Sequence, residues 1–337
     1  METPNELTQL LLSLSKLLEV GNPIGHRNLT LVPLFGQSAP LEYTLAADAI
    51  ADGTLVVREI SDSGDVNVLL VENKGSKRVL LLDGEELVGA KQNRILNTTI
   101  LIEAGTTQKI PVSCVEQGRW RHTSKQFVSG TYAPPRMRRR KSRAVGQSYA
   151  RCGEAVSDQS EVWSDVDEMV SALHTETPTR AMKDAYDQRA ADFEGFVKAL
   201  PYPAGARGVM AAVSGQFTAL DALDKAASFE RIWTRLVTGY AVDAVRQRNQ
   251  DARPFSERNA RGILDSLAAC RVARFKAVGL GSELRFESDQ VLGQALVVDD
   301  VLVHMSVFPN EQQHRGAHDS GGHIMPPSFR RRPRREP

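Results

Sequence analysis

LLLDGEELVGAKQNRILNTTILIEAGTTQKIPVSCVEQGRW, residues 80–120, is the stretch that decides the fold. It contains three apolar runs and two polar joints that carry glycine. The joint at residues 84–94 separates the first two runs, and the joint at residues 116–120 follows the third. Rigid strands on either side of such joints hold polar side chains in fixed positions. We therefore expect short strands here, with the residues of a functional site on the two joints.

The composition is that of an ordinary globular protein. The 337 residues include 42 Lys and Arg against 41 Asp and Glu, a formal net charge of +1. A balance this close to zero creates no global field that favours nucleic acid or a membrane surface. The 3 cysteines are too few and too widely spaced for a disulfide framework and fit a reducing compartment. With no signal pattern at the N-terminus and no apolar run approaching ~20 residues, we expect a cytoplasmic protein that does not enter a membrane.

The region from residue 29 to residue 128 has the pattern of β-structure. Short branched runs are bounded there by Gly, Asp, Asn or Ser, which is typical of strands and turns. Many such strands at close intervals favour a mostly antiparallel β-sandwich or a partly open barrel. The expected strands are residues 29–35, 55–60, 66–72, 79–82, 95–102 and 108–116, with a brief helix at 44–51.

Helices follow this region, and strands return near the end of the chain. Asp158 precedes an apolar stripe at helical spacing and is expected to cap that helix. The other expected helices are residues 180–200, 228–246 and 256–269, and the expected strands are 208–214, 217–220, 272–278, 283–287, 294–298 and 302–308. The order of β-rich, helical and mixed segments predicts an α+β fold.

The ends of the chain differ from the centre. Leucines at helical spacing in residues 7–20 predict an amphipathic helix that serves packing or oligomerisation. Residues 310–337 contain little that could form a core and are expected to be a disordered basic tail. We thus divide the chain into an N-terminal helix (1–24), a main domain (25–309, β-rich at 28–130, helical at 136–200 and mixed at 206–308) and the tail.

The first joint has two interpretations. It carries Glu85, Glu86, Lys91, Gln92, Asn93 and Arg94. Arginine suits a bidentate contact to phosphate or carboxylate, and the amides suit base or ribose edges. By composition alone a solvated turn, with glycines serving the backbone, is the favoured interpretation.

The second joint follows an apolar run that contains Cys114. This thiol has no neighbouring histidine to act as a base, so a buried packing role is favoured over a nucleophilic one. Glu116, Arg119 and Trp120 combine a carboxylate, a guanidinium and an aromatic plane, and together they indicate a ligand clamp.

Other candidate sites are weaker. No H-E-x-x-H, P-loop, G-x-S-x-G or paired C-x-x-C motif occurs, and the histidines have poor spacing for a metal. His304 stands alone in an apolar strand and is expected to be a satisfied core histidine. The basic run at 136–143 either meets phosphates of RNA or of a nucleotide ligand, or pairs with the acidic helix after Asp158, and the pairing interpretation is favoured.

The two central motifs resemble those of the ADP-ribosylglycohydrolase- and rhodanese-phosphatase-associated protein domain. The similar runs are LLLDGEELVGAKQNR (80–94) and IPVSCVEQGRW (110–120), and SDQSEVW (157–163) resembles the helix entry of the family. The resemblance extends over residues 29–308 and departs from the family pattern at 219–222, where the family is more aromatic. The residues that it carries over are Glu85, Glu86, Gln92, Asn93, Arg94, Glu116, Arg119 and Trp120.

The resemblance implies a function connected with ADP-ribose or phosphate esters, because the family is named for the domains that it accompanies. We expect binding or processing of a phosphorylated, nucleotide-derived small molecule such as ADP-ribose. One alternative is a hydrolase that uses Glu85, Glu86 or Glu116 as an acid or base. Another is a protein-interaction or RNA-associated scaffold that uses the segment 136–143. If the motifs form a site, Glu85, Arg94, Glu116 and Arg119 should converge on one cleft.

Overall fold

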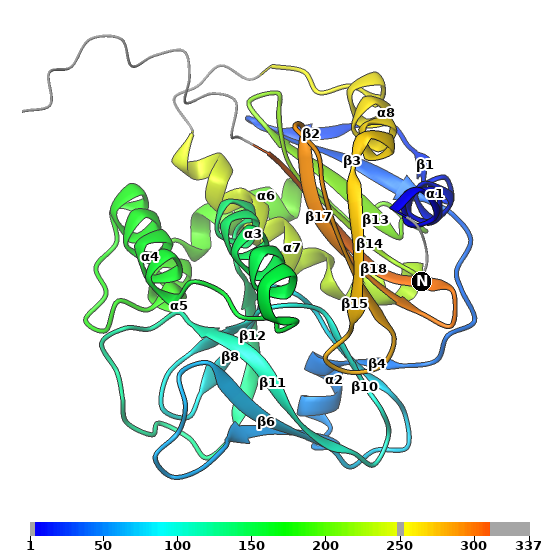
Figure 1. Ribbon diagram of the computed structural model, residues 1–337. Coiled ribbons are helices and arrows are strands. Elements are labelled where there is room, and N and C mark those ends of the chain that lie inside the picture. The colour runs from blue at the N-terminus through cyan, green and yellow to red at the C-terminus, as the bar shows by residue number, and fades with distance from the viewer. Residues whose placement is uncertain (1–3, 248–252, 311–337) are drawn as a thin grey trace, which may run out of the picture.

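The computed structural model describes residues 4–247 and 253–310, which form a large sheet, a smaller β unit and the helices around them (Figure 1). The expected disordered tail, 310–337, lies outside the described residues except for Asn310. No helix in the described part of the chain is both long enough and apolar enough to cross a membrane.

The large sheet is antiparallel throughout. Within the described residues it has 9 strands in the order β1-β3-β13-β14-β18-β17-β16-β15, with β2 beside β3. Asp299 and Asp300, both at positive φ, form the two-residue turn between β17 and β18 that their sequence predicts. The strands are β1 (Glu19–Val20), β2 (Ile24–His26), β3 (Leu29–Phe35), β13 (Gly208–Val213), β14 (Gln216–Leu223), β15 (Arg271–Lys276), β16 (Ser282–Glu287), β17 (Val291–Val298) and β18 (Val301–Pro309).

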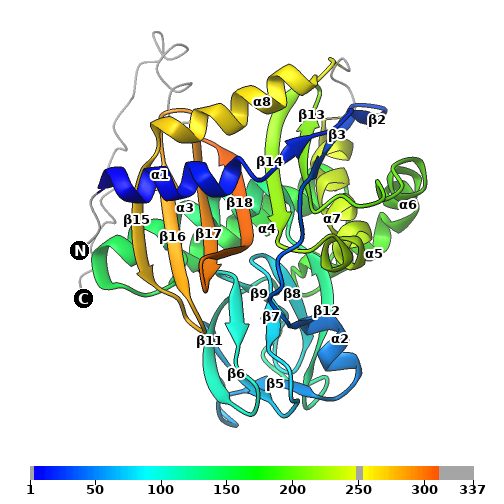
Figure 2. The same cartoon turned by 90° about the vertical axis from the view of Figure 1, so that its right-hand side faces the viewer.

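Helices cover both faces of this sheet (Figure 2). On one face lie α1 (Pro4–Ser15), α8 (Glu257–Ser266) and the 3-10 turn Leu267–Ala269; on the other lie α3 (Pro135–Cys152) and α7 (Ala226–Arg246). Because side chains alternate along a strand, Val32 and Leu34 pack with α1, whereas Leu29 and Leu31 pack with α7. The apolar face of α1 is therefore buried within the chain itself, as a packing helix would be, but the helix ends at Ser15 and residues 19–20 form the strand β1.

The smaller β unit contains the motif stretch. Within the described residues one sheet has the order β12-β8-β9-β11-β6-β5, and a second has the order β10-β7-β4, in which β4 and β7 are parallel. Their apolar side chains, together with α2 (Ala46–Ala51), make a separate core. The strands are β4 (Thr44–Leu45), β5 (Leu55–Glu59), β6 (Val68–Asn73), β7 (Val79–Leu81), β8 (Glu85–Gly89), β9 (Arg94–Leu96), β10 (Ile100–Ile102), β11 (Thr107–Cys114) and β12 (Phe127–Tyr132).

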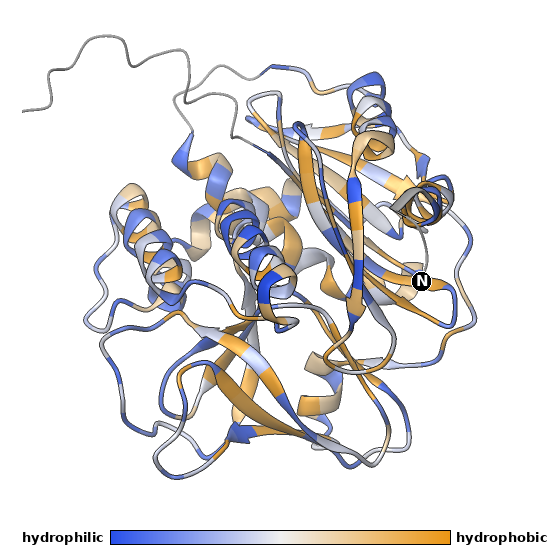
Figure 3. Ribbon diagram, viewed as in Figure 1, coloured by the Kyte–Doolittle hydropathy of each residue, from blue (hydrophilic) through white to orange (hydrophobic). Residues whose placement is uncertain are grey.

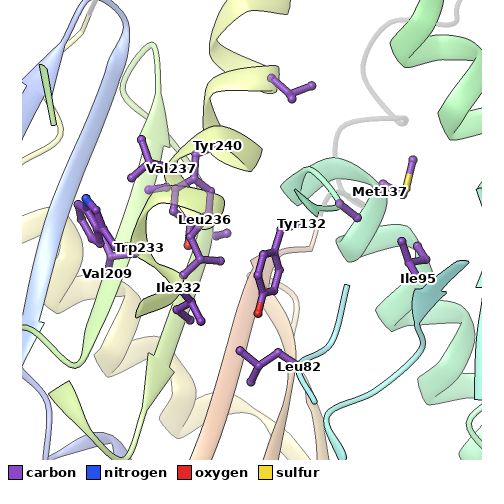
Figure 4. Packing of buried hydrophobic residues seen from close by; sticks show 14 of the residues in the cluster. Leu82, Ile95, Tyr132, Met137, Val209, Ile232, Trp233, Leu236, Val237 and Tyr240 are labelled. Carbon is purple, nitrogen blue, oxygen red and sulfur yellow. The ribbon is translucent and has the colours of Figure 1, made fainter. Parts of the chain in front are cut away.

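A shared core joins the two β units. Figure 4 shows Leu82 and Tyr132 of the smaller unit close to Ile232, Leu236 and Tyr240 of α7. The remaining helices, α4 (Gln159–Leu173), α5 (Met182–Gln188) and α6 (Ala190–Ala199), pack beside α3 and α7. Together these elements confirm the predicted α+β fold with a β-rich N-terminal part, central helices and strands near the C-terminus.

One helix begins at the residue that the sequence predicts, whereas two other predicted elements are each divided in the structure. The Asp158 carboxylate accepts hydrogen bonds from the backbone N–H groups of Ser160 and Glu161, as expected of an N-cap. The predicted helix at 180–200 is two helices, which meet at Arg189. The predicted strand at 95–102 is β9 and β10, separated at residues 97–99, where polar side chains bond to distant segments.

The largest correction concerns residues 85–89. They were interpreted as part of a polar joint, yet they form the buried strand β8. Leu87 enters the core of the smaller unit, and both glutamates find partners inside the protein. Buried carboxylates hid the alternating pattern by which a strand is normally recognised.

Candidate functional site

Neighbouring strands bring the two motifs together. β8 and β9 form a hairpin connected by residues 90–93, and β9 pairs on its other side with β11, so that Arg94 lies opposite Cys114. The second motif continues directly from the end of β11. Residues 90–94 and 114–120 therefore meet at one end of the smaller sheet.

A buried ion pair fastens these two segments. Arg119 donates from Nε to Glu116 Oε1 at 2.7 Å and from Nη2 to Glu116 Oε2 at 2.5 Å. Its Nη1 donates to the Ala90 carbonyl at 2.6 Å, and its Nη2 also reaches Asn93 Oδ1 at 3.1 Å. Glu116 Oε2 additionally accepts from the Asn93 backbone N–H at 3.0 Å. Every guanidinium nitrogen of Arg119 is engaged, so this pair holds the two loops in place.

Arg94 is in the opposite situation. Its side chain is 0% exposed, and Nη1 donates to Gln92 Oε1 at 3.0 Å. Among the described residues, no acceptor lies within hydrogen-bond reach of its Nε or its Nη2. Burial lowers the pKa of this guanidinium from its usual value, and arginine side chains in proteins remain protonated. Arg94 therefore offers two unused donor nitrogens on a buried positive charge.

An exposed indole lies over this charge. Trp120 is 47% exposed, and its ring centroid is 5.8 Å from Arg94 Cζ and 5.1 Å from Lys91 Nζ. Glu59 lies on the same side and accepts from the Lys91 backbone N–H at 3.2 Å through Oε1. Its Oε2 is buried and has no partner in the described part of the chain. We call Glu59, Lys91, Arg94 and Trp120 the Arg94 site.

A cleft of about 610 Å³ adjoins the Arg94 site. Its walls are the end of β5 with the chain after it, including Glu59 and Asp62, and the loop that includes Thr123 and Lys125. Thr123 Oγ1 accepts from Arg119 Nη1 at 3.1 Å, so the loop on this wall is fastened to the buried ion pair. A small molecule in this cleft would contact Glu59 directly.

Glu85 and Glu86 do not belong to this arrangement. Adjacent residues of a strand point to opposite faces, so the two carboxylates separate. Glu85 Oε1 accepts from Arg235 Nη1 at 2.9 Å, on the side of α7. Glu86 Oε2 accepts from Thr131 Oγ1 at 2.9 Å, and burial raises the pKa of Glu86 to about 7. Arg94, Glu116 and Arg119 therefore lie close together and Glu85 does not, and none of the four lines the cleft.

Cys114 has the packing role that its sequence context favours. Its side chain is 0% exposed, and Sγ donates to Gln92 Oε1 at 3.3 Å. Burial raises the pKa of the thiol, which keeps it protonated and poorly nucleophilic. No group of three or more His, Cys, Asp or Glu side chains within the described ranges could hold a metal ion.

The family model described as the ARG and Rhodanese-Phosphatase-superfamily-associated Protein domain matches residues 17–308. The chain belongs to this family. No curated protein and no solved structure matches the chain.

Sequence reasoning overlooked a buried charge network in this family member. Figure 3 shows α3 as a largely hydrophilic helix, although it packs against the large sheet. Arg138 of α3 donates to both oxygens of Asp221, at 2.9 and 2.6 Å, and to Asp83 at 3.4 Å. Lys141 also pairs with Asp83. Burial alone would raise the pKa of Asp221, but the charge of Arg138 lowers it well below the usual range.

The same network contains His304 and explains the basic run. His304 Nδ1 lies 2.6 Å from Thr99 Oγ1, which confirms a satisfied core histidine. Arg136 and Arg140 form ion pairs with carboxylates of α4, as the favoured interpretation expects. Arg138 and Lys141 share a helix face with buried Met137 and Val145, and this spacing was the available signal of their burial. The run is therefore largely occupied by partners inside the protein.

Proposed function

We propose that this protein binds a phosphorylated, nucleotide-derived small molecule of the ADP-ribose class at the Arg94 site. The observation that carries the proposal is the buried guanidinium of Arg94, whose Nε and Nη2 have no partner among the described residues. Buried charges are normally paired, because an unpaired one loses its hydration without compensation. A phosphate oxygen would accept from both nitrogens in the bidentate geometry that arginine favours.

The neighbours of Arg94 fit the rest of such a ligand. Lys91 supplies a second positive charge near the phosphate position, and the exposed indole of Trp120 supplies a plane on which a base can stack. The free Oε2 of Glu59 would accept from a ribose hydroxyl. Because Trp120 covers Arg94, the phosphate reaches the guanidinium only after the indole turns outward.

The alternative functions lack a comparable observation. A hydrolase would need a glutamate that is available as an acid or base. Arg119 holds both carboxylate oxygens of Glu116, and Arg235 and Ser129 donate to the carboxylate of Glu85. The hydroxyl and the backbone N–H of Thr131 hold one oxygen of Glu86, and its other oxygen has no partner among the described residues. An RNA-associated role through 136–143 would have to compete with the internal ion pairs of α3.

Calorimetry with ADP-ribose tests the proposal. We expect wild-type protein to bind, and Arg94→Gln to weaken binding by roughly tenfold or more, as for loss of a charge-assisted hydrogen bond. Trp120→Ala should also weaken binding, and Trp120→Phe should restore part of the loss, because a smaller ring still stacks.

Arg121→Ala is the matched control. Arg121 lies on the same loop and has an exposed side chain, so its removal changes the local charge without touching the Arg94 site. We expect its dissociation constant to equal that of the wild type. Absence of ADP-ribose binding by the wild type, or equal binding by Arg94→Gln, would contradict the proposed function.

A further inference from the structure

A second cavity, of about 460 Å³, lies where the two β units meet. Its walls come from β11 and the start of β6, from the end of α3 with the loop after it, and from the end of β15. Figure 2 shows the ends of β15 and β16 approaching β11, and Gln108 Nε2 donates to the Val278 carbonyl at 3.4 Å across this junction. The cavity shares no lining residue with the Arg94 site.

The interior of this cavity is largely apolar. Val68, Pro111, Val156 and Val278 contribute to its walls and keep part of their surface accessible. Val156 is 40% exposed, and in the described part of the chain only three other large hydrophobic side chains are exposed to such an extent. Apolar surface left open in a concave site favours a ligand with an apolar body.

The charged groups at the cavity are predominantly cationic. Lys109 and Lys276 both line it and are exposed, and neither ammonium group forms a hydrogen bond or an ion pair with another described residue. Glu154 is the one carboxylate among the lining residues of the described chain, so the rim retains a net positive charge. Tyr149 also lines the cavity, and its hydroxyl has no partner within the described ranges. These groups complement an anionic head.

We propose that this cavity binds a small amphiphilic carboxylate, with its apolar body against Val156 and Val278 and its carboxylate between Lys109 and Lys276. An aliphatic chain and an aromatic ring would both satisfy the walls. The carboxylate distinguishes this ligand from neutral apolar compounds, because only an anion gains from the two unpaired lysines. The site is independent of the proposed nucleotide function.

Titration of the full chain with decanoate and with 2-naphthoate, followed by calorimetry, tests this site. We expect binding of at least one of them, and the stronger ligand identifies the aliphatic or the aromatic class. Lys109→Glu and Lys276→Glu should each weaken that binding about tenfold, since each replaces an attraction with a repulsion near the surface. Decanol, which has the same chain without the charge, should bind equally to the wild type and to both variants.

Three controls separate the site from general effects. Lys16→Glu makes the same change in charge on an exposed residue outside the cavity and should leave carboxylate binding unchanged. Arg94→Gln should also leave it unchanged, so that failure of the nucleotide proposal does not affect this one. Val278→Trp, which fills the cavity, should abolish binding while thermal unfolding shows a folded protein. Absence of carboxylate binding by the wild type, or unchanged binding in both lysine variants, would overturn the proposal. A hydrophobic peptide that binds to the cavity when neither carboxylate binds would also overturn it.

Discussion

The contrast between Arg119 and Arg94 gives a prediction about stability. Both side chains are buried at the same end of the smaller sheet. Arg119 has ionic and carbonyl partners for its nitrogens, whereas no described residue forms an ion pair with Arg94. Replacing Arg119 with Met leaves the Glu116 carboxylate buried without its counter-charge. Loss of one partner of a buried pair costs about 3–5 kcal/mol of unfolding free energy. We expect Arg119→Met to lie in that range.

Arg94→Met should behave differently. It removes a charge that has lost its hydration without gaining a carboxylate, and Gln92 Oε1 keeps the hydrogen bond from Cys114 Sγ. We expect a loss of less than about 1 kcal/mol, or a gain in stability, as is common where a functional residue is strained by its surroundings.

Urea unfolding at constant pH measures both values. The midpoint and slope of each variant are compared with the wild type and with Arg121→Met, whose side chain is exposed and whose stability should be unchanged. Equal destabilisation by Arg94→Met and Arg119→Met would refute the distinction between a binding group and a structural one. A loss below about 1 kcal/mol for Arg119→Met would refute the role of its ion pair.

Three further predictions concern the interior. Arg138→Met should lower the unfolding free energy by about 3–5 kcal/mol, because it leaves the buried Asp221 carboxylate without its counter-charge. Arg151→Met, at an exposed position of the same helix, should leave the unfolding free energy unchanged. A small effect of Arg138→Met in urea unfolding would contradict the role of this ion pair. The pKa of Glu86 is raised in the folded state, so its contribution to stability is present below about pH 4.5 and is lost as the pH rises through about 7. Glu86→Gln should therefore gain stability over the wild type between about pH 5 and about pH 8, and a constant difference in melting temperature would show that Glu86 is ionised throughout. Ellman's reagent should react rapidly with one thiol of the native protein, that of exposed Cys152, and with Cys114 and Cys270 only after denaturation; rapid reaction of a second thiol would contradict their burial.

Much of the fold follows from local rules. The strand at Leu29–Phe35 and the helix ending at Arg246 are found where apolar periodicity places them, and the Asp299–Asp300 turn follows from its residue types. The predictions are wrong where contacts with distant segments determine the local structure. Residues 97–99 leave the strand because their side chains bond to residues 155, 283 and 304, and no local pattern carries that information.

The candidate site could be predicted only in part, because some of its residues come from distant segments of the chain. The residues that lie close together because β9 pairs with β11 are Gln92, Asn93, Arg94, Glu116, Arg119 and Trp120. Glu85 was misplaced because residues 85–89 were not recognised as a strand, whose alternation separates it from Glu86. Glu59 comes from a distant strand, and only the folded chain brings it to Lys91.

The most direct test of the central claim observes the Arg94 Nε–H group itself. In ¹⁵N-labelled protein, Arg94→Lys identifies this resonance by its disappearance. Addition of ADP-ribose should shift the Nε–H resonance downfield and slow its exchange with water, because a phosphate oxygen then accepts from it. Adenosine, which has no phosphate, should leave the resonance unchanged. An Arg94 Nε–H signal that does not respond to saturating ADP-ribose would contradict the account.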